Sequence, residues 1–216
     1  NDMKPMEFSS NYGASAAGVA YAAGVSIEEA EAFLKKKAEA FPQVNAYHEL
    51  VEDTVESNCT SHREYADDGT SRLYKIGRMV MPCGTTFTYR QQERTTYIDG
   101  RPTTYMAFAP TQMKNYQTQG TAGLVIQASN AAIIRHLLDV DFYDYRFLPI
   151  NTVHDEDDFD GHTSVLEEAI PAIKEIMEDV LPRMHDLGYT DWDLTYPVGV
   201  SYGLNWQDQH DWEGTV

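Results

Sequence analysis

The sequence has little of what a disulfide scaffold, a zinc protein or a membrane protein needs. Cys59 and Cys83 are the only cysteines in 216 residues, and neither lies in a zinc-ligand pattern. Two thiols in a chain of this length predict a reduced, cytoplasmic setting. The seven histidines are scattered without a ligand pattern. Since long apolar runs and a signal peptide are also missing, we expect no membrane partner.

Positive charge is scarce as well. The chain carries 16 Lys and Arg against 34 Asp and Glu, a formal net charge of −18. Composition alone therefore favours an acidic protein that does not bind nucleic acid, because phosphate contacts need Lys and Arg. If the protein does bind nucleic acid, its cations must form a local patch or lie on another portion of the protein.

The chain is long enough for one domain with a core, or for two small layers that share one. Its first residue is Asn1 rather than Met. We therefore expect a portion of a longer product, either a split gene product, a cleaved chain or a truncation.

The stretch KPMEFSSNYG, residues 4–13, is the first candidate binding site. As a helix it places Lys4, Phe8 and Tyr12 on one face. Pro5 suits a first helical turn, where no backbone donor is missed. The free N–H groups of that end, together with Lys4, favour phosphate, and the two rings are suited to stack on a base and a sugar. The alternative is an amphipathic helix with two core aromatics and a snorkelling lysine.

Two further stretches carry polar groups in suggestive positions. Residues 151–156, NTVHDE, follow an apolar run and predict a strand that enters a tight turn. The longest helical pattern runs from Thr111 to about Leu138 and contains KNYQTQGTA, in which Asn115 and Gln119 share a face. Taken alone, Asn115 and Gln119 would more often be helix-capping or surface amides.

Three motifs, in their order along the chain, resemble the family A DNA polymerases of the bacterial DNA polymerase I and phage replicative type. They are Lys-x3-Phe-x3-Tyr-Gly, Gln-Gly-Thr-Ala and Val-His-Asp-Glu. The segments AEAFPQVNAY and GLNW add matches, so the resemblance covers nearly the whole chain. It implies an α+β fold, with mostly helical fingers over residues 1–108. The carboxy-terminal part of a palm with an antiparallel sheet would follow over residues 109–216. The right-hand polymerase architecture would be incomplete in this chain.

The resemblance also implies DNA-directed DNA synthesis by nucleotidyl transfer with two Mg²⁺ ions. The implied catalytic residues are Asp155, Glu156 and Lys4, of which Asp155 and Glu156 would also bind the metal. Nucleotide binding is implied for Lys4, Phe8, Tyr12 and Gly13. Lys4 would contact the triphosphate, Phe8 would pack on the sugar, and Tyr12 would gate the templating position. DNA contacts are implied for Asn115, Gln119 and His154.

The chain lacks three groups that the family carries. It contains no Asp-Tyr-Ser-type motif to supply the first metal-binding Asp. The Arg that precedes the motif lysine by four residues would fall before Asn1, and Thr111 stands where the family has another Arg. The resemblance therefore implies a fragment that is inactive alone and shares its two Mg²⁺ ions with a carboxylate on an amino-terminal portion. The other implied partners are a DNA primer-template and deoxynucleoside triphosphates, in the cytoplasm of a bacterial host if a phage encodes the protein.

Two alternatives stay open. A single-subunit phage-type RNA polymerase fragment would share the lysine-to-tyrosine and His-Asp elements, but there Ser usually follows the Asp. Glu156 and the Gln-Gly-Thr-Ala run favour the DNA enzyme. The other alternative is a non-catalytic, polymerase-like DNA-binding subunit, against which the presence of both Lys4 and Asp155 argues.

Local patterns predict the remaining elements. Ser26 and Glu29 predict a capping box on a helix that runs to about Phe41, and a further helix follows Pro42. Residues 74–81 and 85–89 alternate as strands of a hairpin do. The cationic cluster Lys35–Lys37 is expected to be a solvated helix face, with a weak phosphate contact as the alternative.

The second half of the chain predicts an acidic loop over residues 139–144, a strand over 145–153 and a helix over 164–179. The stretch between the last two is acidic where apolar alternation is expected. This acidity predicts a hairpin that is short or has an acidic outer face.

Overall fold

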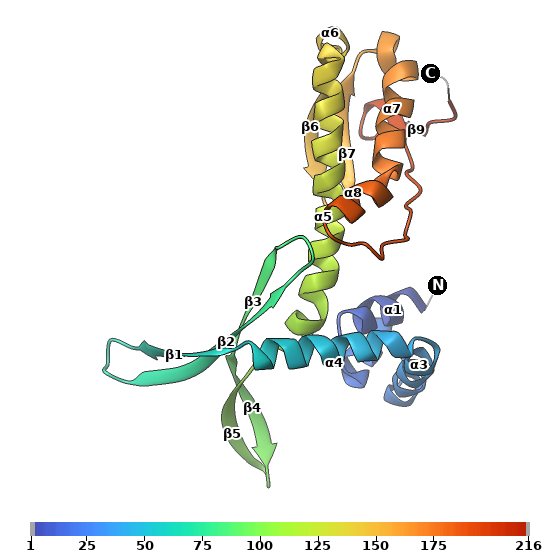
Figure 1. The fold of residues 1–216 in the computed structure, drawn as a ribbon. Helices are drawn as coiled ribbons and strands as arrows, with labels where there is room; N and C mark the ends of the chain where they lie inside the picture. The colour runs from blue at the N-terminus through green and yellow to red at the C-terminus, as the bar shows by residue number, and fades with distance from the viewer. Residues whose placement is uncertain (1–2, 215–216) are drawn as a thin grey trace. The chain divides into compact units, whose positions relative to one another are not determined.

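The computed structural model describes residues 3–214, so Asn1, on which the expectation of a longer product rested, lies outside the described residues. The chain divides into two compact units, an amino-terminal unit ending at Gln119 and a carboxy-terminal unit beginning at Gly120. Helices and small antiparallel sheets make up both units (Figure 1). The predicted α+β class is therefore confirmed.

Four helices open the amino-terminal unit: α1 (Met3–Asn11), α2 (Ala16–Ala23), α3 (Ile27–Ala40) and α4 (Pro42–Ser57). The predicted capping box is present, because the Glu29 N–H donates to Ser26 Oγ at 3.1 Å and the Ser26 N–H donates to Glu29 Oε2 at 3.0 Å. Pro42 occupies the start of α4, where its missing N–H costs nothing. These helix boundaries agree with the sequence patterns to within a few residues.

Gly13 ends α1. Its φ of +74° is in the left-handed region, and the Gly13 and Ala14 N–H groups donate to the carbonyls of Ser10 and Ser9. This hydrogen-bond pattern is the Schellman motif, in which glycine is the favoured residue because it has no Cβ. The glycine of the Lys-x3-Phe-x3-Tyr-Gly motif therefore determines where the helix stops.

Small residues allow α1, α2 and α3 to pack closely. The buried cluster between them consists of Met6, Val19, Ala20 and Ala30. A second cluster joins α4 to the strands and to the start of α5, and it consists of Val51, Val55, Tyr89, Phe108 and Met113. Gly77 has no room for a side chain there, because a Cβ would lie 2.5 Å from the Val55 side chain.

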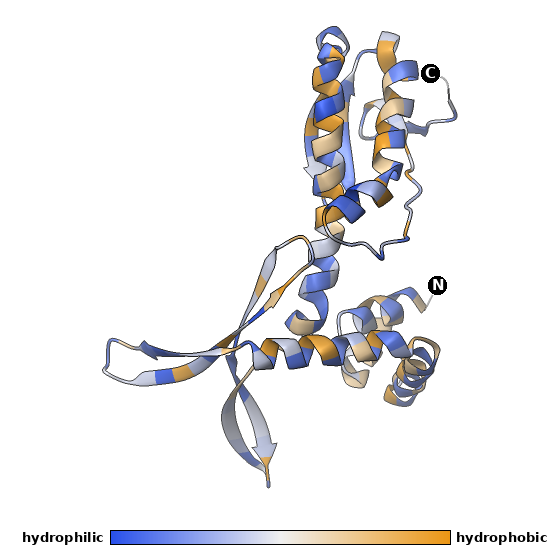
Figure 2. Ribbon diagram, viewed as in Figure 1, coloured by the Kyte–Doolittle hydropathy of each residue, from blue (hydrophilic) through white to orange (hydrophobic). Residues whose placement is uncertain are grey.

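Two sheets complete the amino-terminal unit. The first has the antiparallel order β1 (Thr60–Tyr65), β2 (Ser71–Val80) and β3 (Thr86–Arg90), which confirms the predicted hairpin. The second pairs β4 (Gln92–Ile98) with β5 (Arg101–Ala107). Figure 2 shows that β4 and β5 are largely hydrophilic except near their tip, whereas α4 carries both hydrophobic and hydrophilic residues along its length.

The long helix α5 (Pro110–Asp139) confirms the longest helical pattern and contains the point at which the two units divide. The carboxy-terminal unit continues with α6 (Asp141–Tyr145), β6 (Phe147–Val153), β7 (Glu156–Gly161), the 3-10 turn η1 (Thr163–Val165), α7 (Leu166–Glu178), α8 (Val180–Asp186), β8 (Ser201–Asn205) and β9 (Asp208–Asp211). Its main core joins α5 and α7 through Ile133, Leu137, Phe147, Ala169, Ile170 and Ile173. The predicted helix after Ser164 is thus confirmed as η1 and α7.

The expected acidic loop over residues 139–144 is wrong. Residues 141–145 form one left-handed turn, α6, with φ values between 49° and 59°. Such a turn costs roughly 1–2 kcal/mol per residue. Tyr143 offsets part of that cost, because its ring is buried in the main core and its hydroxyl lies 3.0 Å from His136 Nε2. Tertiary burial of one tyrosine therefore overrides the local polar pattern.

The acidic stretch after Glu156 does form a strand. β7 pairs with β6, and Phe159 of β7 stacks on Phe147 of β6 at 5.0 Å between ring centroids. Asp157 accepts a hydrogen bond from Thr152 Oγ1 at 2.7 Å, and Asp158 accepts one from Asn151 Nδ2 at 3.3 Å. Neighbouring polar side chains therefore donate to one oxygen of each carboxylate, whereas Asp157 Oδ2 is buried without a hydrogen-bond partner.

No helix within residues 3–214 combines the length and the apolarity that crossing a bilayer requires.

Candidate functional site

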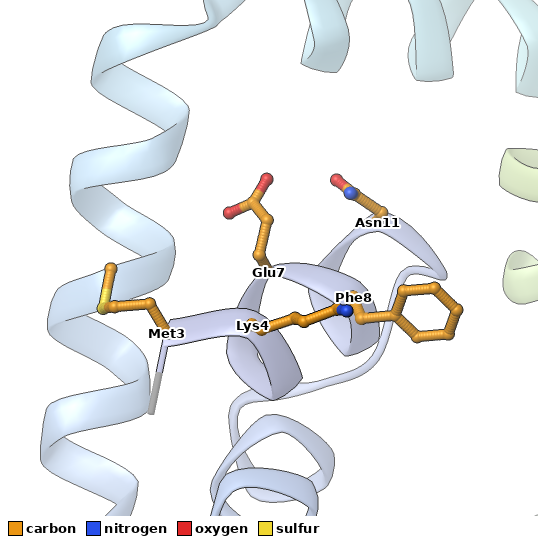
Figure 3. A pocket seen from close by; sticks show the side chains of 5 residues that line it. All are labelled: Met3, Lys4, Glu7, Phe8 and Asn11. Atoms are coloured by element: carbon orange, nitrogen blue, oxygen red, sulfur yellow. The ribbon is translucent and has the colours of Figure 1, made fainter. Parts of the chain in front are cut away.

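The face of α1 that carries Lys4 and Phe8 is open to solvent. The two side chains line a hollow of about 360 Å³ together with Met3, Glu7 and Asn11. Figure 3 shows Lys4 extended along α1 toward Phe8, with Glu7 and Asn11 on one common side of the helix. The Phe8 ring is 60% exposed, whereas Met6 of the same helix is buried. The alternative of two core aromatics is therefore wrong for Phe8, which presents an apolar ring beside a cation.

Tyr12 lies next to Phe8 and reaches α5. The two ring centroids are 4.8 Å apart with the planes tilted by 46°. Gln119 Nε2 donates a hydrogen bond to Tyr12 Oη at 3.1 Å, across 107 positions of sequence. The fold thus brings together two motifs that the sequence placed far apart, the ring-bearing helix and the amide-bearing helix.

Gly13 and the first turns of α5 are also in contact. A Cβ on Gly13 would lie 3.0 Å from Cδ of Lys114, the residue before Asn115. Asn115 is half-buried on α5, one turn before Gln119. Contacts of these residues, or of their neighbours in the chain, therefore link four of the implied site residues of α1 and α5: Phe8, Tyr12, Gly13 and Gln119.

Gln117 anchors this part of α5, a role that the sequence analysis missed. Its side chain is 1% exposed, and Nε2 donates to Tyr89 Oη at 2.6 Å and to Met79 Sδ at 3.3 Å. Burial raises the pKa of Tyr89 to about 12, because a phenolate would be poorly solvated there. The sequence signal that could have indicated this role is the helical period. Residue 117 points away from the helix face that residues 115 and 119 share.

Lys37 is the second residue whose role was missed. Only 15% of its side chain is exposed, and its ammonium donates to Glu7 Oε1 at 2.8 Å, Ser10 Oγ at 2.7 Å and Asn11 Oδ1 at 2.5 Å. Lys35 and Lys36 are exposed. The expected solvated face of the Lys35–Lys37 cluster is therefore wrong at Lys37, because α3 packs that position against α1.

The remaining implied site residues belong to the carboxy-terminal unit. His154 and Asp155 form the turn between β6 and β7, and Glu156 begins β7 opposite Val153. His154 has a φ of 56°, as two-residue hairpin turns often require. All three side chains are exposed. The hairpin thus presents two adjacent carboxylates to solvent.

Carboxylate oxygens are the ligands that Mg²⁺ prefers, so the chemistry of Asp155 and Glu156 fits this ion. Their number does not complete a site for two ions. Within residues 3–214 no group of three or more His, Cys, Asp or Glu side chains is placed to hold a metal.

The features on which the resemblance rests are a cation and an exposed ring on α1, an amide donor on α5 and a His-Asp-Glu turn between β6 and β7. The family model of DNA polymerase family A matches residues 1–208, nearly the whole chain. The protein therefore belongs to DNA polymerase family A, as the resemblance predicted, and its general function is DNA synthesis from DNA and deoxynucleoside triphosphates. No curated protein sequence and no solved structure gave a match.

Proposed function

We propose that the protein is the carboxy-terminal portion of a phage-like DNA-directed DNA polymerase. Residues 1–108 would be its fingers and residues 109–216 the carboxy-terminal part of its palm. The observation that carries the proposal is the contact between Tyr12 and Gln119. It joins the family's nucleotide-binding motif to its primer-contacting motif inside one compact unit.

Residues of α1 would bind the incoming deoxynucleoside triphosphate. The Lys4 ammonium would pair with the triphosphate and donate a proton to the leaving pyrophosphate. Phe8, whose exposed ring lines the same hollow, would pack on the sugar. Tyr12, whose ring packs at a tilt against Phe8, would occupy or release the templating position, and Gly13 would let the chain turn immediately after it.

The primer terminus would contact Asn115, Gln119 and His154. Both amides carry N–H donors, which can test the geometry of a base pair at the minor-groove acceptors without identifying its sequence. Gln119 already donates to Tyr12 in this structure. A base or sugar acceptor that takes this N–H would displace the tyrosine hydroxyl.

Asp155 and Glu156 would hold Mg²⁺ together with an Asp on an amino-terminal portion of the polymerase. The metal would neutralise charge on the phosphates and make the primer 3′-oxygen nucleophilic. The two exposed carboxylates supply hard oxygen ligands on a short hairpin, whose paired strands limit their movement. The setting would be the cytoplasm, that of a bacterial host if a phage encodes the protein.

Primer extension tests the proposal. The purified chain should give no magnesium-dependent product, because it lacks the partner carboxylate. Joined to an amino-terminal portion that carries an Asp-Tyr-Ser-type motif, it should extend a primer on a DNA template. Extension by the chain alone would refute the need for that portion, and DNA binding without extension in the joined protein would favour a non-catalytic subunit.

A further inference from the structure

Lys37 connects α3 to the helix that carries the proposed nucleotide site. Its ammonium contacts three side chains of α1, Glu7, Ser10 and Asn11, at 2.5–2.8 Å. Two of these, Glu7 and Asn11, also line the hollow beside Lys4 and Phe8. An ammonium with three acceptors and 15% exposure is held in one place, unlike a solvated lysine.

Glu7 is a difficulty for a site that binds triphosphate. It lies on the same hollow as Lys4, in a chain whose formal net charge is −18. An unpaired carboxylate there would repel the phosphates and offset the attraction of Lys4. Its ion pair with Lys37, at 2.8 Å, cancels that charge and draws the carboxylate toward α3.

We propose that Lys37 is a positioning residue of the nucleotide site, which pairs with Glu7 and so keeps this carboxylate from competing with the triphosphate for Lys4. The inference rests on the proposed function of that hollow. Among the described residues, the charged side chains that line the hollow are Lys4 and Glu7, and Lys37 of α3 pairs with Glu7. Removal of Lys37 would leave Glu7 to compete with the triphosphate for Lys4.

A double-mutant cycle on the full chain separates this role from a structural one. The probes are dATP and inorganic tripolyphosphate, titrated without metal while the backbone amide signals of α1 are followed by NMR. Lys37→Gln should weaken the binding of both probes by about threefold to tenfold, the effect of one newly unpaired charge at close range. In the Glu7→Gln background the same change should alter affinity by less than about twofold, because no carboxylate is left to compensate.

The controls keep the charge or remove a different one. Lys37→Arg should retain parent affinity, and Lys36→Gln, which removes an exposed charge from the same cluster, should change it by less than about twofold. If Lys37→Gln weakened binding equally in both Glu7 backgrounds, Lys37 would only be holding α1 through Ser10 and Asn11, and the proposal would fail. If Lys36→Gln weakened binding as much as Lys37→Gln, the effect would come from the overall charge of the protein and not from the pair of Lys37 with Glu7.

Lys4→Ala distinguishes failure of the inference from failure of the proposed function. If the parent chain binds neither probe, or if Lys4→Ala leaves binding unchanged, the nucleotide site itself is misplaced and the inference falls with it. If Lys4→Ala weakens binding while Lys37→Gln does not, the nucleotide site stands and the role of Lys37 is refuted.

Discussion

Gln119 donates its side-chain amide to the Tyr12 hydroxyl at 3.1 Å, so the residue proposed to test the primer terminus is bonded to the residue proposed to gate the template. A ligand that takes the donated N–H must displace the tyrosine oxygen, and the hydrogen bond that it breaks contributes roughly 0.5–1.5 kcal/mol net. If these proposed roles hold, the bond couples nucleotide-side and primer-side events within one compact unit.

Tyr12→Phe keeps the ring and removes the hydroxyl. Because Gln119 would no longer be engaged, the chain should bind a primer-template about twofold to tenfold more tightly, the equivalent of one modest hydrogen bond. Fluorescence anisotropy with labelled DNA measures this affinity. Tyr116→Phe is the matched control, since Tyr116 is an exposed tyrosine of α5. Unchanged affinity in Tyr12→Phe would show that Gln119 does not need to be released.

Phe8 should make the complete polymerase discriminate against dideoxynucleotides. A hydroxyl at this position can replace an interaction lost with the 3′-hydroxyl of the nucleotide, and a phenylalanine has none. Phe8→Tyr should therefore relax the discrimination, by about tenfold or more if the bonded groups are buried in the closed complex. Competition between deoxy- and dideoxynucleotides in a gel-based termination assay measures it.

Phe41→Tyr provides the control for this change, because Phe41 is a second exposed phenylalanine of the amino-terminal unit. It should leave termination as in the parent. Equal termination by the parent and by Phe8→Tyr would mean that Phe8 does not face the nucleotide, and the assignment of α1 would have to be abandoned.

Asp155→Asn should nearly abolish primer extension in the joined polymerase. The change keeps the size of the side chain and removes the charge, so the fold and the affinity for DNA should persist. Turnover should fall by at least about a hundredfold, since a metal ligand supports several kcal/mol of charge stabilisation in the transition state. Asp160→Asn, an exposed carboxylate on the same hairpin, is the control. A rate within a few-fold of the parent would make Asp155 an ordinary surface carboxylate.

Tyr89→Phe should destabilise the fold. One N–H of Gln117 Nε2 would lose its acceptor at 2.6 Å while remaining buried, and Met79 Sδ would be the partner that is left. Leaving one buried donor unpaired costs about 1–3 kcal/mol. Urea unfolding followed by circular dichroism measures the loss. The double variant with Gln117→Leu should be less destabilised than the sum of the two single variants, and strict additivity would show that the two side chains are energetically independent.

The same tyrosine predicts a dependence of stability on alkaline pH. Its pKa is raised to about 12 in the folded state from the ordinary value of 10.0, so folding favours the protonated phenol. The contribution of Tyr89 to the free energy of unfolding is complete below about pH 10 and is lost as the pH rises through the folded-state pKa. Tyr89→Phe should therefore show a shallower fall in the free energy of unfolding across this window than the parent. If the free energy of unfolding fell in parallel with pH in the parent and in Tyr89→Phe, the high pKa would belong to another residue.

Elements with strong local signals could be predicted from the sequence. Ser26 and Glu29 cap a helix through atoms three residues apart, and Gly13 ends α1 because only glycine adopts its dihedral angles without strain. The order of the motifs was enough to indicate the family, which the match over residues 1–208 confirms. Roles of single residues, including the metal-binding role of Asp155, remain predictions.

The sequence by itself determined the local elements, the class of fold and the family, because capping, periodicity and motif order act over a few residues or along one chain. Only the tertiary structure decided which distant side chains meet. The Lys37 and Glu7 pair, the Gln117 and Tyr89 pair and the left-handed turn around Tyr143 all depend on packing between elements far apart in sequence. No local pattern specifies such contacts, since their free energy comes from burial that exists only once the elements are assembled.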